Sequence, residues 1–257
     1  MPPGDAYRPF CLADRPNHVR ILQRAAERTG GFGVLTQATV TDTVIDLIAE
    51  LDVPVVVDCG VFSTEDFEGG LRDLFDVYDR MDADYGLIPD VIGERISTDK
   101  MVEDAGRLWR GGQRWGFEPV GVAQGECPAD YAASFWDCYQ LGVDHIAVGG
   151  LLDQSGERSG GHATARDELF EAIELIRGQH RRIWRDTWTF ALGCDHPQRR
   201  PRLAGLGLDG ADSKWWLFQY DSEATASREE QLVNVVVRAA WDRTQQLSAF
   251  GTNAGEA

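Results

Sequence analysis

Three aspartates, each at or near the end of a short apolar run, are the residues of this chain best suited to acid–base or nucleophilic chemistry. Asp58 ends a Pro-Val-Val-Val run, Asp90 follows Tyr-Gly-Leu-Ile-Pro, and Asp212 lies in Gly-Leu-Asp-Gly-Ala-Asp-Ser. Short apolar runs of this kind predict buried strands, and parallel α/β folds place their chemistry at the carboxyl ends of the strands. Carboxylates that meet there could attack a bound group or exchange protons with it.

Polar and glycine clusters end two further apolar runs. Gln124 follows Pro-Val-Gly-Val-Ala, and its amide can donate and accept hydrogen bonds at once, which suits the edge of a nucleobase. Gly149 and Gly150 follow His-Ile-Ala-Val, and their missing side chains would let a ligand approach the backbone. A tight turn explains the glycine pair equally well.

These ends belong to a regular alternation of apolar runs and segments of helical period. The predicted strands are Pro9–Ala13, Phe32–Leu35, Pro54–Asp58, Tyr85–Ile88, Pro119–Ala123, His145–Val148, Thr187–Leu192 and Gly210–Ser213. The predicted helices are Arg15–Arg28, Thr41–Leu51, Thr64–Met81, Thr98–Trp115, Ala129–Leu141, Arg166–His180, Pro201–Leu206 and Arg228–Leu247. Eight such units predict an α/β protein, a (β/α)8 TIM barrel in one domain over residues 1–250, with a disordered tail at 251–257. A doubly wound open sheet is the alternative.

The charge of the chain is strongly acidic but unevenly spread. A net charge of −17 over 257 residues disfavours non-specific attachment to nucleic acid. Between Arg177 and Arg202, however, seven arginines oppose two aspartates. Arg199, Arg200 and Arg202, together with Lys214, are therefore candidates for contacts with phosphates, although a solvated linker would explain the arginines as well.

The remaining sequence features predict a cytoplasmic protein without a membrane span. The sequence has no long uncharged apolar run, and its first residues do not resemble a secretion signal. The five cysteines are scattered, without a Cys-x-x-Cys pair, which favours a reducing compartment and argues against a structural zinc site. The glycine-rich segment Asp153–Thr164 is predicted to be a lid or binding loop.

Taken in order, the clusters resemble the motifs of the tRNA-guanine transglycosylases. The first segment is similar to that family's Asp-Ser-Gly-Gly-Phe/Tyr motif and the last to its Gly-[Ile/Val]-Asp-x-Phe-Asp-Cys/Ser motif. The likeness spans about Asp58 to Ser213. The matching segments are Asp58-Cys-Gly-Val-Phe, Pro-Asp90, Val-Ala-Gln124-Gly, Val-Gly149-Gly150-Leu and Gly-Leu-Asp-Gly-Ala-Asp212-Ser.

The resemblance implies a TIM barrel that exchanges guanine in a nucleic acid for a 7-deazaguanine such as preQ0 or preQ1, without a cofactor. Asp212 would be the nucleophile that forms a covalent glycosyl-enzyme, and Asp58 the general acid and base. Asp90 would bind the Watson–Crick edge of the base. Gln124 and the backbone of Gly149 and Gly150 would contact its far side. The resemblance leaves a homodimer open.

Two departures from the family pattern bear on the substrate. The tRNA enzymes carry a zinc site of three cysteines and one histidine after the nucleophile, whereas no cysteine follows Asp212 here, and Val61 replaces the second glycine of the first motif. With Ser213 after the nucleophile, the chain is more similar to the phage and bacterial relatives that place 7-deazaguanines into DNA. DNA is therefore the expected substrate and tRNA the alternative. A non-catalytic base-binding subunit also remains open, as does a glycoside hydrolase, which would more usually carry glutamate at its strand ends.

Overall fold

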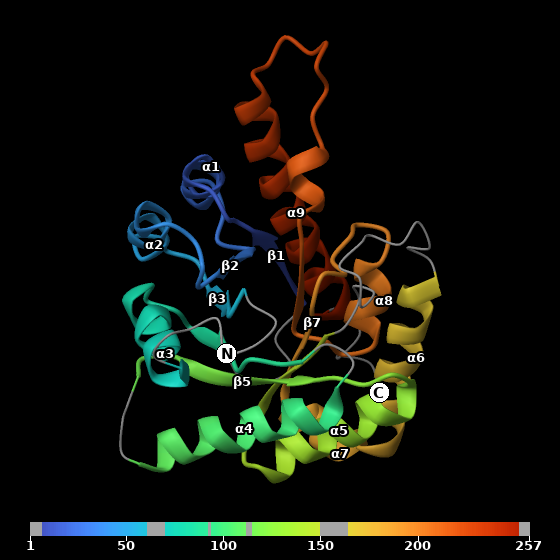
Figure 1. The fold of residues 1–257 in the computed structure, drawn as a ribbon. Helices are drawn as coiled ribbons and strands as arrows, with labels where there is room; N and C mark the ends of the chain where they lie inside the picture. The colour runs from blue at the N-terminus through green and yellow to red at the C-terminus, as the bar shows by residue number, and fades with distance from the viewer. Residues whose placement is uncertain (1–6, 61–69, 92–93, 112–114, 150–163, 252–257) are drawn as a thin grey trace.

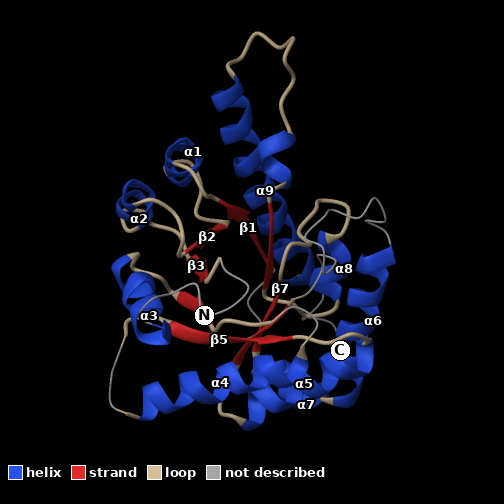
Figure 2. Cartoon of the chain, viewed as in Figure 1, coloured by secondary structure: helices blue, strands red, loops and turns tan. Residues whose placement is uncertain are grey.

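The structure is a computed structural model that describes residues 7–60, 70–91, 94–111, 115–149 and 164–251. Eight parallel strands pair in chain order, and β8 pairs with β1, so the sheet closes into a barrel with helices around it (Figures 1 and 2). The strands are β1 (Arg8–Leu12), β2 (Gly33–Gln37), β3 (Val55–Asp58), β4 (Tyr85–Leu87), β5 (Glu118–Ala123), β6 (His145–Val148), β7 (Trp188–Ala191) and β8 (Gly210–Ser213). This confirms the predicted α/β (β/α)8 TIM barrel and excludes the open sheet.

The helices cover the outside of the barrel. They are α1 (Pro16–Ala26), α2 (Asp42–Ile48), α3 (Gly70–Arg80), α4 (Arg95–Arg110), α5 (Pro128–Gln140), α6 (Thr164–Gln179), α7 (Arg181–Asp186), α8 (Arg200–Gly205) and α9 (Arg228–Gly251), with a 3-10 turn, η2 (Trp215–Phe218). The structure adds α7 and η2 to the predicted elements, and α9 runs through Gly251, beyond the predicted end at Leu247. The predicted tail from residue 252 on and the predicted loop up to residue 163 lie outside the described residues.

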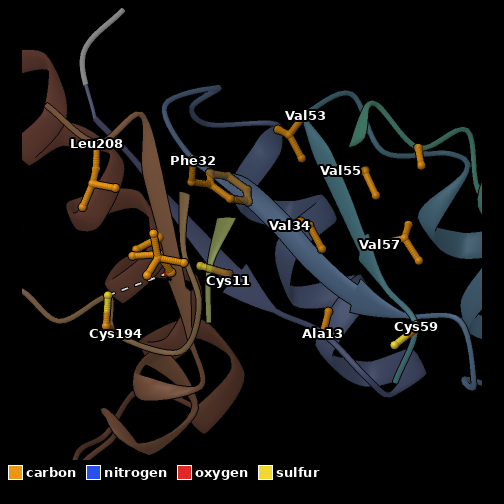
Figure 3. Packing of buried hydrophobic residues seen from close by; sticks show 14 of the residues in the cluster. Cys11, Ala13, Phe32, Val34, Val53, Val55, Val57, Cys59, Cys194 and Leu208 are labelled. Atoms are coloured by element: carbon orange, nitrogen blue, oxygen red, sulfur yellow. Dashed lines mark hydrogen bonds between the residues drawn. The ribbon is translucent and has the colours of Figure 1, made fainter. Parts of the chain in front are cut away.

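Alternate residues of strands β1 to β7 face two different apolar cores. The side chains inside the barrel are Phe10, Leu12, Leu35, Val56, Tyr85, Leu87, Val120, Val122, Ala147, Trp188 and Phe190. Their neighbours along the strands, such as Val34, Val55 and Val57, pack in the larger core that also contains helix residues (Figure 3). Because strand side chains alternate, a residue two positions beyond the last buried inner one also faces the inside. Asp58 follows Val56 in this way, at the C-terminal end of β3.

Glycines on two strands make room for an aromatic ring inside the barrel. The Phe10 ring packs edge-on against Phe190, with centroids 5.1 Å apart. A Cβ on Gly210 would lie 3.0 Å from this ring, and a Cβ on Gly33 would be even closer to it. The two glycines on β2 and β8 are therefore needed for Phe10 to fill the space between these strands.

Replacing Gly33 with alanine is expected to destabilise the barrel by about 1–3 kcal/mol, because the new methyl group overlaps the Phe10 ring in a packed core. Equilibrium unfolding in urea measures the change. Gly178 in α6 is the matched control, since a Cβ there meets no atom within 4 Å. Alanine at that position is expected to be neutral or to stabilise the protein by up to about 1 kcal/mol. Equal free energies of unfolding for the two variants would contradict the packing described.

Candidate active site

The three aspartates singled out in the sequence lie at the C-terminal ends of their strands. Asp58 is the last residue of β3, Asp212 lies in β8, and Asp90 follows β4 by three residues. The negative charge of Asp58 raises the pKa of both Asp90 and Asp212. Asp90 and Asp212 therefore both lie within electrostatic reach of Asp58, although burial is the larger cause of both shifts. That the three side chains line one pocket stays a prediction. Their catalytic roles stay predictions.

Asp212 is the most enclosed of the three. It is 4% exposed, and the backbone N–H of Gly193 donates to its Oδ1 at 2.8 Å. Burial is the main reason that its pKa is raised to about 7, and the charges of Asp58 and Asp195 add to the rise, while the Gly193 bond opposes it. Near neutral pH a substantial fraction of Asp212 is thus ionised, in a fixed orientation and poorly solvated, as a carboxylate nucleophile requires.

Asp58 is half-buried in a tight turn. Burial raises its pKa, and hydrogen bonds from Gly60 and Cys59 act against the rise. The Gly60 N–H lies 3.4 Å from Oδ1, and Gly60 has a φ of +71°, which a residue with a side chain rarely adopts. A carboxyl group with a raised pKa can hold a proton and release it again, as a general acid and base must.

Asp90 and Gln124 form a hydrogen-bonded pair across neighbouring loops. The side-chain N–H of Gln124 donates to Oδ2 of Asp90, and the backbone N–H of Gln124 donates to Ser134 of α5 at 3.2 Å. Burial and the charge of Asp58 raise the pKa of Asp90 to about 7, against the effect of the Gln124 bond. Gln124 is only 1% exposed. Its amide therefore orients Asp90, a contact that the sequence did not predict.

Gly149 makes room for that pair. A Cβ at this position would lie 2.8 Å from Nε2 of Gln124 and 2.9 Å from Val122. Any side chain here would push the glutamine amide away from Asp90. The backbone contact with a base that the sequence predicts for Gly149 stays a prediction, and Gly150 lies outside the described residues.

Asparagine at position 58 is expected to lower the pKa of both Asp90 and Asp212 by roughly half a pH unit or more, because it removes the negative charge that raises them. Titration of the carboxyl carbons by NMR, without any substrate, measures both values. Asp73→Asn on the exposed side of α3 is the control and is expected to leave both unchanged. If Asp58→Asn also leaves both values unchanged, the three carboxylates do not converge.

The predicted phosphate-binding residues need one correction. Arg200 is 5% exposed, and its guanidinium forms two hydrogen bonds with Asp195, so it is not available to a phosphate. The other three are more accessible but each has a protein partner. Arg199 donates to the carbonyl of Cys194, Arg202 to Glu174, and Lys214 to Asp14. Of these, Arg199 and Lys214 lie closest in the chain to the rim, after β7 and β8.

Two further residues at this rim escaped the sequence prediction. Gln37 ends β2, pairs in register with Asp58, and lies two positions after Leu35, on the inner side of the barrel. The predicted strand stopped at Leu35, and extending the alternation by one step would have found Gln37. Asp195, three residues beyond Leu192, is not among the predicted site residues, but it is 4% exposed and its charge raises the pKa of Asp212.

The described parts of the chain contain no group of three or more histidine, cysteine, aspartate or glutamate residues arranged to hold a metal ion. None of the described helices is both long and apolar enough to cross a membrane. No protein-family model matches the sequence, and no curated protein is significantly similar to it. A functional assignment therefore depends on the chemistry of the rim residues and on the order of their motifs.

Proposed function

We propose that this protein exchanges guanine in a nucleic acid for a 7-deazaguanine base, with Asp212 as the nucleophile. The observation that carries the proposal is the enclosed carboxylate of Asp212, held by the Gly193 amide and influenced by the charge of Asp58. Such a pair of carboxyl groups suits substitution at a sugar carbon with retained configuration. The resemblance to the transglycosylases supplies the substrate class, with DNA ahead of tRNA.

The reaction divides into two displacements at C1′ of the nucleotide. In the first, an oxygen of Asp212 attacks C1′, the bond from C1′ to the guanine nitrogen breaks, and Asp58 protonates the departing base. In the second, Asp58 takes the N9 proton of the incoming 7-deazaguanine, whose nitrogen attacks C1′ and releases Asp212. Each step uses one carboxylate as nucleophile or leaving group and the other as proton carrier. The raised pKa of Asp58 suits it to hold a proton before the first step and to take one up again in the second.

Asp90 would recognise the edge that both bases share. The Watson–Crick edge of guanine presents N–H groups at N1 and N2, and an ionised carboxylate can accept hydrogen bonds from both. A 7-deazaguanine has the same edge and differs on the opposite side of the ring. The hydrogen bond from Gln124 keeps Asp90 in one orientation, so the same contact could serve the leaving and the incoming base.

The target nucleotide would have to leave its stack to reach Asp212 inside the barrel mouth. Flipping a base out costs a few kcal/mol, which contacts in the site must recover. Arg199 and Lys214 are the positive side chains nearest the rim in the chain, and they would bind the flanking phosphates in exchange for their present partners.

The direct test is incubation of the purified protein with an isotope-labelled 7-deazaguanine and either duplex DNA or tRNA, followed by mass spectrometry of the nucleosides. Label in DNA is the expected result. Label in tRNA alone would favour the tRNA alternative. Binding of the free base without label in either nucleic acid would contradict catalysis and favour a base-binding subunit.

A further inference from the structure

The loop after β7 holds Asp212 at two points. The Gly193 N–H donates to Oδ1 of its side chain at 2.8 Å, and the Asp195 N–H donates to its backbone carbonyl at 2.9 Å. The orientation of the carboxylate therefore depends on where the segment from Gly193 to Asp195 lies. No described residue bonds the second oxygen, Oδ2, which leaves that oxygen for chemistry.

A buried, hydrogen-bonded cluster of three side chains holds this loop in place. Arg200 donates from Nε to Oδ1 of Asp195 at 2.8 Å and from Nη2 to Oδ2 at 2.7 Å, and the Tyr7 hydroxyl donates to Oδ1 at 2.7 Å. All three residues are 5% exposed or less. They come from α8, from the segment before β1 and from the loop itself, so distant parts of the chain meet at one carboxylate.

Such a cluster is costly to bury and well defined once formed. Two buried charges lose their hydration, which only good geometry and further hydrogen bonds offset. The parallel bonds between a guanidinium and a carboxylate, with a hydroxyl as third donor, supply that geometry. A buried pair of this kind stabilises a protein little more than apolar packing would, which suggests that its value lies in fixing a conformation.

We propose that Tyr7, Asp195 and Arg200 are positioning residues for Asp212. They hold the loop so that the Gly193 amide stays on Oδ1 and Oδ2 faces the sugar carbon. The catalytic consequence rests on the proposed function, whereas the effect on Asp212 itself does not.

The charges around Asp212 determine what the loss of Arg200 would do. Asp58 and Asp195 are the charged groups that raise the pKa of Asp212. Arg200 lies against Asp195 and neutralises it, so its removal leaves a second uncompensated carboxylate beside Asp212 and loosens the Gly193 bond. Both changes disfavour the ionised form. Among the described residues, the cluster is also faced by the Cys11 and Cys194 thiols and by the Trp215 ring, 5.8 Å from the guanidinium.

Carboxyl-carbon NMR of the free protein tests the proposal without any substrate, and Asp212→Asn assigns the signal. In Arg200→Gln the midpoint of the Asp212 titration is expected to move upward by about one pH unit. Arg107→Gln is the matched control, since Arg107 forms ion pairs with Glu103 and Asp104 on the exposed side of α4. It is expected to leave the midpoint unchanged. An unchanged midpoint in folded Arg200→Gln would overturn the proposal.

Two gentler variants keep the test decisive if Arg200→Gln does not fold. Tyr7→Phe removes one donor and no charge, and Arg200→Lys keeps the charge but cannot form the two parallel bonds. Both are expected to speed hydrogen exchange at the Gly193 amide severalfold and to raise the Asp212 midpoint. If exchange and midpoint stay as in the wild type in both variants, the cluster does not position Asp212.

Kinetic measurements distinguish the positioning role of the cluster from the proposed base-exchange activity. Arg200→Lys is expected to lower kcat for base exchange about tenfold with an unchanged KM for the incoming base, because Asp90 and Gln124 are untouched. A lowered affinity with unchanged kcat would contradict a positioning role. If the wild-type protein exchanges no base but the Asp212 midpoint still responds to Arg200, the proposed function fails while the positioning of Asp212 holds.

Discussion

Asparagine in place of Asp212 is expected to lower the rate of base exchange by at least about 10⁴-fold, because the amide oxygen cannot form the glycosyl bond. The substitution keeps the shape of the side chain and an oxygen that can accept the Gly193 bond. Incorporation of a labelled 7-deazaguanine into DNA measures the rate. A second measurement withholds the incoming base and looks for a protein–nucleic acid adduct that survives denaturation.

The wild-type protein is expected to form this adduct and Asp212→Asn to form none. Asp73→Asn, on the exposed side of α3, controls for the loss of one negative charge and is expected to react like the wild type. An adduct in the Asp212→Asn protein would assign the nucleophile to another residue.

The same substitution is expected to make the protein more stable at alkaline pH. Folding raises the pKa of Asp212 from 3.8 to about 7, so the folded state holds this proton more tightly than the unfolded chain does. Stability therefore falls as the pH rises from about 4 to 7, by about 4 kcal/mol in total for this group. Asparagine never ionises and avoids this loss, which is a common conflict between stability and activity at catalytic positions.

Denaturant unfolding at several pH values measures the difference. Asp212→Asn is expected to exceed the wild type by about 4 kcal/mol at pH 8 and to match it near pH 2, where the aspartate is protonated in both states. A difference that is constant across this range would mean that the stabilisation does not come from ionisation. A less stable variant at pH 8 would contradict the raised pKa.

Sequence periodicity was sufficient to predict the barrel. The strands of a closed parallel sheet are buried on both sides, so runs such as Val55–Val57 are continuously apolar and easy to find. The prediction was wrong where local signals compete with tertiary contacts. Thr98 was predicted to begin a helix, yet α4 begins at Arg95, and the buried Thr98 hydroxyl instead accepts a hydrogen bond from the Val91 N–H. The six-residue α7 is too short to show a helical period.

The candidate site, like the fold, could be predicted only in part from the sequence. The positions of Asp58, Asp90 and Asp212 followed from where their apolar runs end, because a strand end is a local property. The hydrogen-bond partners around the site could not be predicted from the sequence. Arg200 was grouped with other arginines because of the local charge, but its guanidinium binds Asp195. Asp195 also accepts a hydrogen bond from the hydroxyl of Tyr7, which is 188 positions away in the sequence. Only the closed barrel brings these segments together.

The aromatic side chains inside the barrel affect the order in which the two bases of the proposed reaction could leave and enter. Phe10, Tyr85, Trp188 and Phe190 occupy the interior beneath the three aspartates. Among the described residues, these rings fill the barrel below the carboxylates, so we expect a ligand to reach Asp212 from the end of the barrel that carries the carboxylates. In the proposed reaction, the guanine would have to leave through this end before the 7-deazaguanine could enter, so between the two displacements C1′ would be bonded to Asp212 while the sugar remains part of its nucleic-acid strand.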